Sequence, residues 1–205
     1  MTTATAVEVP TLIGTPFAGG IYAGRFVLDG HEYANILALK AAGEHEDTPW
    51  NKSLKEVSGA LSYIDGLANT QAMAAAGSKI AKWALEQRIG DFDDWHIPAL
   101  DQLELCYRHL KPTTERNWCY ARSGINLHSA PQGHPYTPDS PQQTTVYTFR
   151  ADGAEAFDPV WYWTSTQYAG YSDFAWLQNF GDGFQGSGRK SNDFRVRLVR
   201  RELIR

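Results

Sequence analysis

The sequence predicts an α+β domain in which strands from both ends of the chain share a sheet and two helices lie between them. Three observations predict this fold class. Residues 20–39 alternate in character around a turn signal, and the stretch 161–201 begins and ends in residues typical of strands. Two segments of helical periodicity, 70–88 and 98–110, separate these regions.

The first strands are expected at the N-terminal side, as a hairpin. Asp29-Gly30 stands between two apolar runs, which is a strong hairpin signal, so we place strands over 20–28 and 31–39. The following segment, 41–52, is polar and contains a proline, and we expect a loop there.

Two helices follow. Asn69 or Thr70 is a plausible N-cap for a helix over 70–88, with a glycine at the stop. Pro98 suits the first turn of a second helix that ends at Leu110. Residues 113–150 concentrate proline and small polar residues, so we expect a long insert loop that builds no packed core and serves function or subunit contact.

The last third combines two strand signals with a middle of different composition. Trp161 to Thr166 is rich in aromatic and hydroxyl residues, and the run 194–200 alternates apolar residues with arginine. We interpret these arginines as lying on the solvent side of a strand, paired with acidic neighbours, while contact with an acidic glycan or a phosphate backbone is the alternative. The middle is rich in Gly, Ser, Asn, Tyr and Phe, the mixture that binding loops use.

Composition limits the class of protein. The formal net charge of −4 argues against nucleic acid as a partner. The apolar runs are shorter than the roughly 18 residues of a membrane span, and the first residues do not resemble a signal peptide, so we expect residues 1–12 to be a flexible tail and 13–205 the domain. Cys106 and Cys119 could form a disulfide, although two free, buried thiols are the expected state.

Signals for catalysis or metal binding are weak. The histidines are scattered and the G-x-S-x-G pattern of a nucleophile elbow does not occur. The segment DFDDW (91–95) lacks the spacing of a calcium loop. The segment GDGFQGSG (181–188) lacks the Gly-Lys-Ser/Thr ending of a phosphate loop, and we interpret it as a turn between strands. We therefore expect no enzyme activity, catalytic residue, metal ion or cofactor.

Several motifs carry a family resemblance: DGLANT, then DWHIP at the start of the second helix, YWTST, and FRVRLVR. Over about residues 17–200 the chain resembles the Lcl C-terminal domain family, in the formylglycine-generating-enzyme-like branch of the C-type lectin fold. The resemblance implies two helices, small antiparallel sheets and long loops. It also implies that Asp94 caps backbone N–H groups and that Trp95 fills the core. The enzymes of that branch use cysteines near the C-terminus, which are missing here after Cys119.

The same resemblance suggests where a ligand would bind. This fold also serves as the variable protein of diversity-generating retroelements, including receptor-binding proteins of phage tails, and those systems diversify surface residues near the C-terminus. Aromatic residues among glycines are the expected anchors, unless they pack under their own loops. The expected ligand-binding residues are Tyr168, Gly170, Tyr171, Ser172, Asp173, Phe174, Asp182, Phe184, Ser187, Arg189, Ser191, Asn192 and Asp193.

These observations favour a non-catalytic receptor-binding protein at the tip of a phage or prophage tail. Its expected partner is a host-surface protein or glycan, and analogy to tail tips suggests a homotrimer. Its location would be the virion, the bacterial surface, or the cytoplasm before assembly. The alternative is an intracellular accessory or scaffold protein that binds a partner through the same loops; an unrecognised enzyme comes third.

Overall fold

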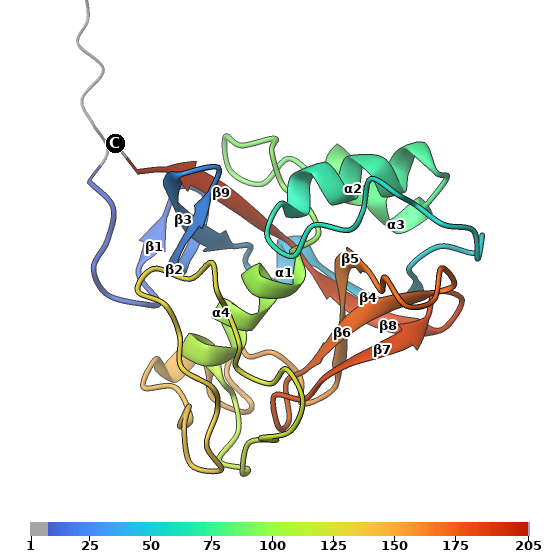
Figure 1. The fold of residues 1–205 in the computed structure, drawn as a ribbon. Helices are drawn as coiled ribbons and strands as arrows, with labels where there is room; N and C mark the ends of the chain where they lie inside the picture. Colours follow the sequence, from blue (N-terminus) through green and yellow to red (C-terminus); the bar gives the residue numbers. More distant parts are fainter. Residues whose placement is uncertain (1–7, 205) are drawn as a thin grey trace, which may run out of the picture.

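Two curled sheets form the framework of the protein, whose computed structural model describes residues 8–204 (Figure 1). The expected tail, residues 1–12, lies mostly outside the described residues. One sheet has the order β1 (Pro16–Phe17), β2 (Gly20–Leu28), β3 (His31–Leu37), β9 (Val199–Leu203). The other has the order β4 (Glu44–Pro49), β8 (Asp193–Arg197), β5 (Trp161–Gln167), β6 (Phe174–Asn179), β7 (Gln185–Arg189). All pairs are antiparallel except β5 with β8.

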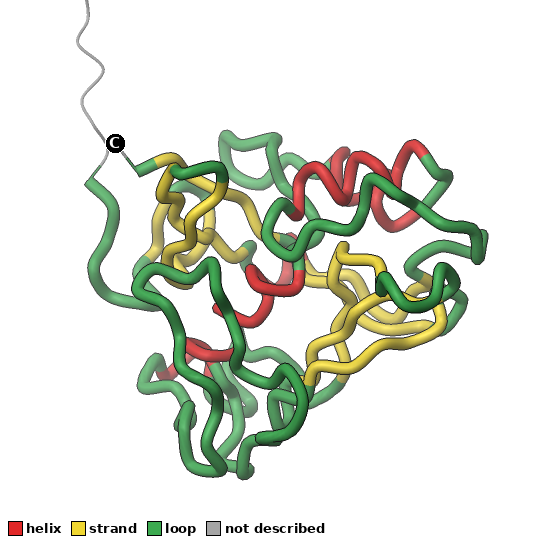
Figure 2. The backbone as a smooth tube through the Cα atoms, in the orientation of Figure 1, coloured by secondary structure: helices red, strands yellow, loops and turns green. Residues whose placement is uncertain are grey.

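Few helices accompany the sheets, as Figure 2 shows in red. They are α1 (Lys40–Gly43), α2 (Gly66–Ala75), α3 (Lys79–Glu86), α4 (Leu100–Leu110) and a short 3-10 turn, η1 (Tyr147–Phe149). The central helix α4 packs against β2 and β3 of one sheet and β5 and β6 of the other. It therefore fills the space between the two sheets. No helix within residues 8–204 is long and apolar enough to cross a membrane.

The N-terminal hairpin is confirmed. β2 and β3 pair around Asp29 and Gly30, whose φ angles of 51° and 78° are those of a type I′ turn. β3 then pairs with β9 from the other end of the chain, as the prediction of a shared sheet requires. The second predicted helix is confirmed as α4, which begins two residues after Pro98.

The single helix predicted over 70–88 is wrong, because this segment contains two helices. α2 starts earlier, with Asp65 Oδ1 accepting a hydrogen bond from Ala68 N at 3.0 Å. The chain then breaks at Gly77, where φ is 89°, and Ser78 caps α3. Ser78 also donates to the backbone oxygen of Trp50 at 2.5 Å, so a tertiary contact fixes the break.

The loop predicted over 41–52 is also wrong, because the segment forms part of α1 and then β4. β4 is polar and has no apolar alternation; it exists because it pairs with β8, some 150 residues later in the chain. Arg195 on β8 reinforces the pair by bonding Glu44 at 3.1 Å. Local sequence could not show this partner.

The alternating run after Asp193 forms two strands in different sheets. Leu198 joins them, and its backbone bonds both Ala38 and Gly43. The prediction of solvent-facing arginines is wrong for Arg197 and Arg200, which are buried. Because the run passes between layers, both of its faces are covered, and each buried charge needs a partner.

The acidic partners of the buried arginines come from distant loops. Arg197 Nη2 lies 2.6 Å from Glu155 Oε2, and its Nε donates to the backbone oxygen of Ala38 at 3.1 Å. Arg200 Nε lies 2.6 Å from Asp94 Oδ1. Asp94 thus pairs with an arginine and, among residues 8–204, does not cap backbone N–H groups as the family resemblance had implied.

The core contains residues from every region of the chain. Trp95 and Trp163 are fully buried, which confirms Trp95 as a core residue, whereas Trp161 and Trp176 are half-buried. The segment 113–150 has loop geometry apart from η1, and it fills the lower left of Figure 2. The expectation that it contributes no packed core is wrong, because Tyr136 and Phe149 lie in the same buried cluster as α4.

Candidate functional site

Five aromatic rings form a continuous surface at one end of the β6–β7 hairpin. They belong to Tyr63, Tyr168, Tyr171, Phe174 and Trp176, here called the aromatic surface. The Tyr168 ring centroid lies 5.1 Å from that of Trp176 and 6.1 Å from that of Tyr171. Phe174 lies 5.9 Å from Tyr171, and Tyr63 lies 6.2 Å from Trp176. Tyr171 retains 65% of its exposure, while the other four are half-buried.

The β5–β6 connection holds these rings in place. Tyr168 N donates to Phe174 O at 3.0 Å, and Phe174 N donates to Tyr171 O at 3.1 Å. Gly170 lets the turn close over the Tyr168 ring, because a Cβ there would lie 2.6 Å from Tyr168 Cε1. The turn is therefore ordered by its own hydrogen bonds, which lowers the entropic cost of binding.

Charged groups border the aromatic surface. Arg189 Nε lies 3.2 Å from Asp173 Oδ2 in an exposed ion pair. The Arg122 guanidinium lies 4.5 Å above the centre of the Tyr63 ring. Behind the surface, Lys190 donates to Gln167 Oε1 at 2.6 Å, and burial lowers the pKa of its ammonium group to about 8. The accessible chemistry is aromatic contact area with arginine and carboxylate at its rim.

Most of the expected ligand-binding residues lie at this end of the hairpin. Ser172 is exposed in the same turn, and Ser187 is exposed on β7 opposite Trp176. Ser191 and Asn192 are exposed in the turn that follows Arg189, where Asn192 N donates to Arg189 O at 2.8 Å, and Asp193 is exposed at the start of β8.

Asp182 and Phe184 do not join this group. They lie at the opposite end of β6, a strand of six residues, hence about 17 Å away. There Phe184 packs between Trp118 and Trp161, with ring centroids 5.0 and 5.5 Å apart. Asp182 Oδ1 accepts from Phe184 N at 3.0 Å and stabilises the turn.

The stretch between β5 and β8 is also more regular than predicted. It contains the strands β6 and β7, so Phe174, Ser187 and Arg189 are strand residues and not loop residues. Small polar composition suggested a flexible loop, but Gly188 packs closely against neighbouring side chains, since a Cβ there would lie 2.8 Å from Leu177 Cδ1. Sequence reasoning also missed Tyr63 and Arg122, whose position depends on folding of distant segments.

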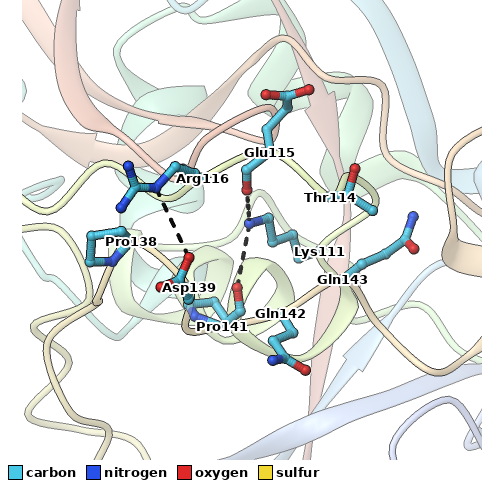
Figure 3. Close-up of a pocket in the computed structure, with 9 residues that line it drawn as sticks. All are labelled: Lys111, Thr114, Glu115, Arg116, Pro138, Asp139, Pro141, Gln142 and Gln143. Carbon is cyan, nitrogen blue, oxygen red and sulfur yellow. Dashed lines mark hydrogen bonds and ion pairs between the residues drawn. The ribbon is translucent and has the colours of Figure 1, made fainter.

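A cavity of about 330 Å³ lies at the other side of the molecule, between the segments 111–116 and 138–143 (Figure 3). Lys111 projects into its wall, where its amine donates to the backbone oxygens of Glu115 and Pro141 and to Asn117 Oδ1. Burial lowers the pKa of this lysine. Because all three donors of the ammonium group are used, Lys111 holds two loop segments together and is not free to bind a ligand.

The hydroxyl groups of the YWTST motif are structural. Thr164 Oγ1 donates to Trp176 O at 3.0 Å, and Thr166 Oγ1 donates to Ser62 O at 2.8 Å. Ser165 is fully buried. Of the two cysteines, both free, Cys106 is buried and Cys119 is exposed, so the expectation of two buried thiols is wrong for Cys119.

These features define a mixed α+β protein with few helices, curled antiparallel sheets and an exposed aromatic surface carried by the C-terminal third. The model of the Lcl C-terminal domain family matches residues 43–200, and the chain belongs to this family. The resemblance to this family is thereby confirmed. The match leaves out β1, β2 and β3, which the predicted range had included.

Among solved structures, the chain is similar to a fimbrial protein from Bacteroides ovatus ATCC 8483, with 11% sequence identity and a TM-score of 0.40. The alignment covers 82% of this chain and 35% of that protein, so the chain spans about a third of the length of its structural neighbour. No curated protein matches the sequence.

Proposed function

We infer that this chain is a non-catalytic binding module whose aromatic surface recognises a protein or glycan on another cell. The observation that supports this function is Tyr171, which stays 65% exposed within a stack of aromatic rings. A large, rigid ring with polar neighbours supplies contact area at low entropic cost. The fold to which we assign it is the C-type-lectin-like fold in its formylglycine-generating-enzyme-like branch.

A binding screen on arrays of glycans and cell-surface proteins tests this function. The wild type is compared with the double variant Tyr171→Ala/Phe174→Ala and with Leu12→Ala, a control because Leu12 is 74% exposed and lies outside both the aromatic surface and residues 113–150. Loss of two aromatic anchors should weaken binding at least about tenfold, whereas the control should bind as the wild type does. Equal binding by the double variant would refute the assignment.

The biological setting that we propose is a phage or prophage tail tip. Display of several copies there would add avidity, and we propose a homotrimer in which residues 113–150 supply the subunit contact. Large apolar side chains are exposed in this segment, among them Trp118, Tyr120 and Leu127. Sedimentation of the purified chain tests the oligomer, and a monomer at all concentrations would contradict it.

Diversification by a retroelement is a further part of the proposal, and the structure limits which positions could vary. Exposed residues such as Tyr171, Ser172 and Asn192 could change freely. Gly188 could not, because a Cβ there would lie 2.8 Å from Leu177 Cδ1. Sibling copies of the gene should therefore differ at the exposed positions and keep Gly188, and a template repeat should lie beside the gene. Identical sibling copies without such a repeat would refute diversification.

A further inference from the structure

β7 is the outermost strand of the five-stranded sheet, paired only with β6 within the described part of the chain, and Figure 1 shows it at the outer margin of that sheet. In an antiparallel pair, alternate residues turn their N–H and C=O groups toward the neighbouring strand. The bonds from Asn179 N to Phe184 O and from Lys190 N to Asp173 O, 2.9 and 2.8 Å long, show that even-numbered residues of β7 face β6.

The odd-numbered residues consequently face away from the sheet. For Gln185 and Ser187, both main-chain groups lack a hydrogen-bond partner among residues 8–204. The C=O of Arg189 accepts a hydrogen bond from Asn192 N, whereas the N–H of Arg189 points outward like those of Gln185 and Ser187. Such a row of unpaired groups is a template for an additional strand.

Gln185 at the start of β7 is covered, with 2% of its surface exposed, so the accessible part of the edge runs from Ser187 to Arg189. The usual protection of a sheet edge is missing from this part. Natural edges carry inward-pointing charges, proline, a bulge or a covering loop. β7 has the sequence Gln-Gly-Ser-Gly-Arg and pairs with β6 without a register shift. Its central side chains are too small to hinder an approaching backbone.

Aromatic rings border this edge on the face to which the glycines belong. Trp161 Cη2 lies 3.4 Å from the position of a Cβ on Gly186, and Phe194 Cε2 lies 3.1 Å from that position on Gly188. Both rings are half-buried. On the opposite face Arg189 is exposed, and its two Nη atoms have no partner in the described residues.

We propose that β7 binds an extended segment of another protein by strand addition. The segment carries an apolar residue at every second position, which covers Trp161 and Phe194, and an acidic residue beside Arg189. A second copy of this chain fits less well as the partner. If two β7 strands paired antiparallel about Ser187, glycine would lie opposite glycine, and the rings of Trp161 and Phe194 would stay uncovered. This interaction goes beyond the aromatic surface, since main-chain groups of the edge supply it.

A displayed library of peptides with apolar residues at alternate positions tests the proposal. Peptides selected on the wild-type chain are measured by fluorescence anisotropy against Ser187→Pro and Ser187→Ala. Proline removes the outward N–H without breaking a bond to β6, whereas alanine removes only the hydroxyl, so their difference isolates the main-chain bond. We expect Ser187→Pro to bind at least about tenfold more weakly, or about 1.4 kcal/mol.

A second measurement changes the peptide instead of the protein. Methylation of the peptide nitrogens that face β7 should weaken binding as the proline does, and it keeps the test decisive if Ser187→Pro does not fold. The proposal is overturned if no selected peptide distinguishes methylated from unmethylated backbone, or if peptides without apolar alternation bind equally well. Self-association that Ser187→Pro abolishes would assign the edge to a second copy and also overturn it.

Discussion

Gln102 donates a hydrogen bond from its side-chain nitrogen to Nε2 of His96 across 3.3 Å in the fully buried junction between α4 and β9. His96 Nδ1 lies 3.1 Å from the backbone oxygen of Asp94, to which it donates in the neutral tautomer. The backbone of His96 also exchanges two hydrogen bonds with Val199. The DWHIP motif thus places a neutral histidine between α4 and the last strand, β9.

The first prediction follows from this histidine. Burial lowers the pKa of His96 from 6.5 to about 4, so the unfolded chain binds a proton more readily than the folded one. Above pH 6.5 neutral His96 makes its full contribution to the free energy of unfolding. As the pH falls from 6.5 toward 4, the free energy of unfolding decreases by about 3 kcal/mol in total. Urea unfolding across this range should show the loss in the wild type and a smaller one in His96→Gln. His31→Gln, an exposed control, should follow the wild type.

The second prediction concerns the two glycines of β7. Gly188→Ala should destabilise the fold by about 1–3 kcal/mol, because its Cβ would approach Leu177 Cδ1 to 2.8 Å in a closely packed region. Gly186→Ala is the matched control on the same strand and face, with its nearest neighbour at 3.4 Å. Thermal melting should separate the two variants. Equal melting temperatures would show that the sheet tolerates side chains at both positions.

The third prediction tests Lys111 as an anchor of the long loop. Lys111→Met removes the donor shared by Glu115, Asn117 and Pro141, so the segments 113–117 and 137–143 should exchange amide hydrogens faster. Lys82→Met, an exposed change on α3, should leave this exchange unchanged. Protection that stays the same in Lys111→Met would mean that backbone bonds such as Thr144 N to Lys111 O suffice.

The fourth prediction separates the two cysteines. Burial raises the pKa of the Cys106 thiol to about 12, whereas Cys119 is exposed. A thiol reagent should therefore modify one cysteine in the native protein and the second only on unfolding. The variant Cys119→Ser should show no fast phase. Rapid modification of both thiols would contradict the buried position of Cys106 on α4.

Local sequence was sufficient to predict an element where the residues of one short segment determine its conformation. The Asp29-Gly30 turn needs only two residues with positive φ, and α4 carries enough apolar periodicity to be recognised. It was insufficient for β4, a polar segment that becomes a strand only by pairing with β8. The break between α2 and α3 at Gly77 and Ser78 could not be predicted from local sequence either, because Ser78 bonds Trp50, which is distant in the sequence.

The candidate site shows the same division. Tyr168, Tyr171 and Phe174 could be selected from composition, because aromatic residues among small polar ones are typical of binding surfaces. Tyr63 and Trp176 could not, since they join the surface through packing between distant elements. Asp182 and Phe184 were selected by the same compositional argument. In the structure, however, the six residues of β6 separate them from the aromatic surface.

The sequence by itself determined the α+β class, the family and the residue types of a recognition surface. Periodicity, turn residues and motifs are local properties, so a linear chain displays them. Only the tertiary structure decided which arginines are buried, which edge of the sheet is left open and which aromatic rings share one surface. Those outcomes depend on contacts such as Arg197 with Glu155 and β4 with β8, whose partners become neighbours only after folding.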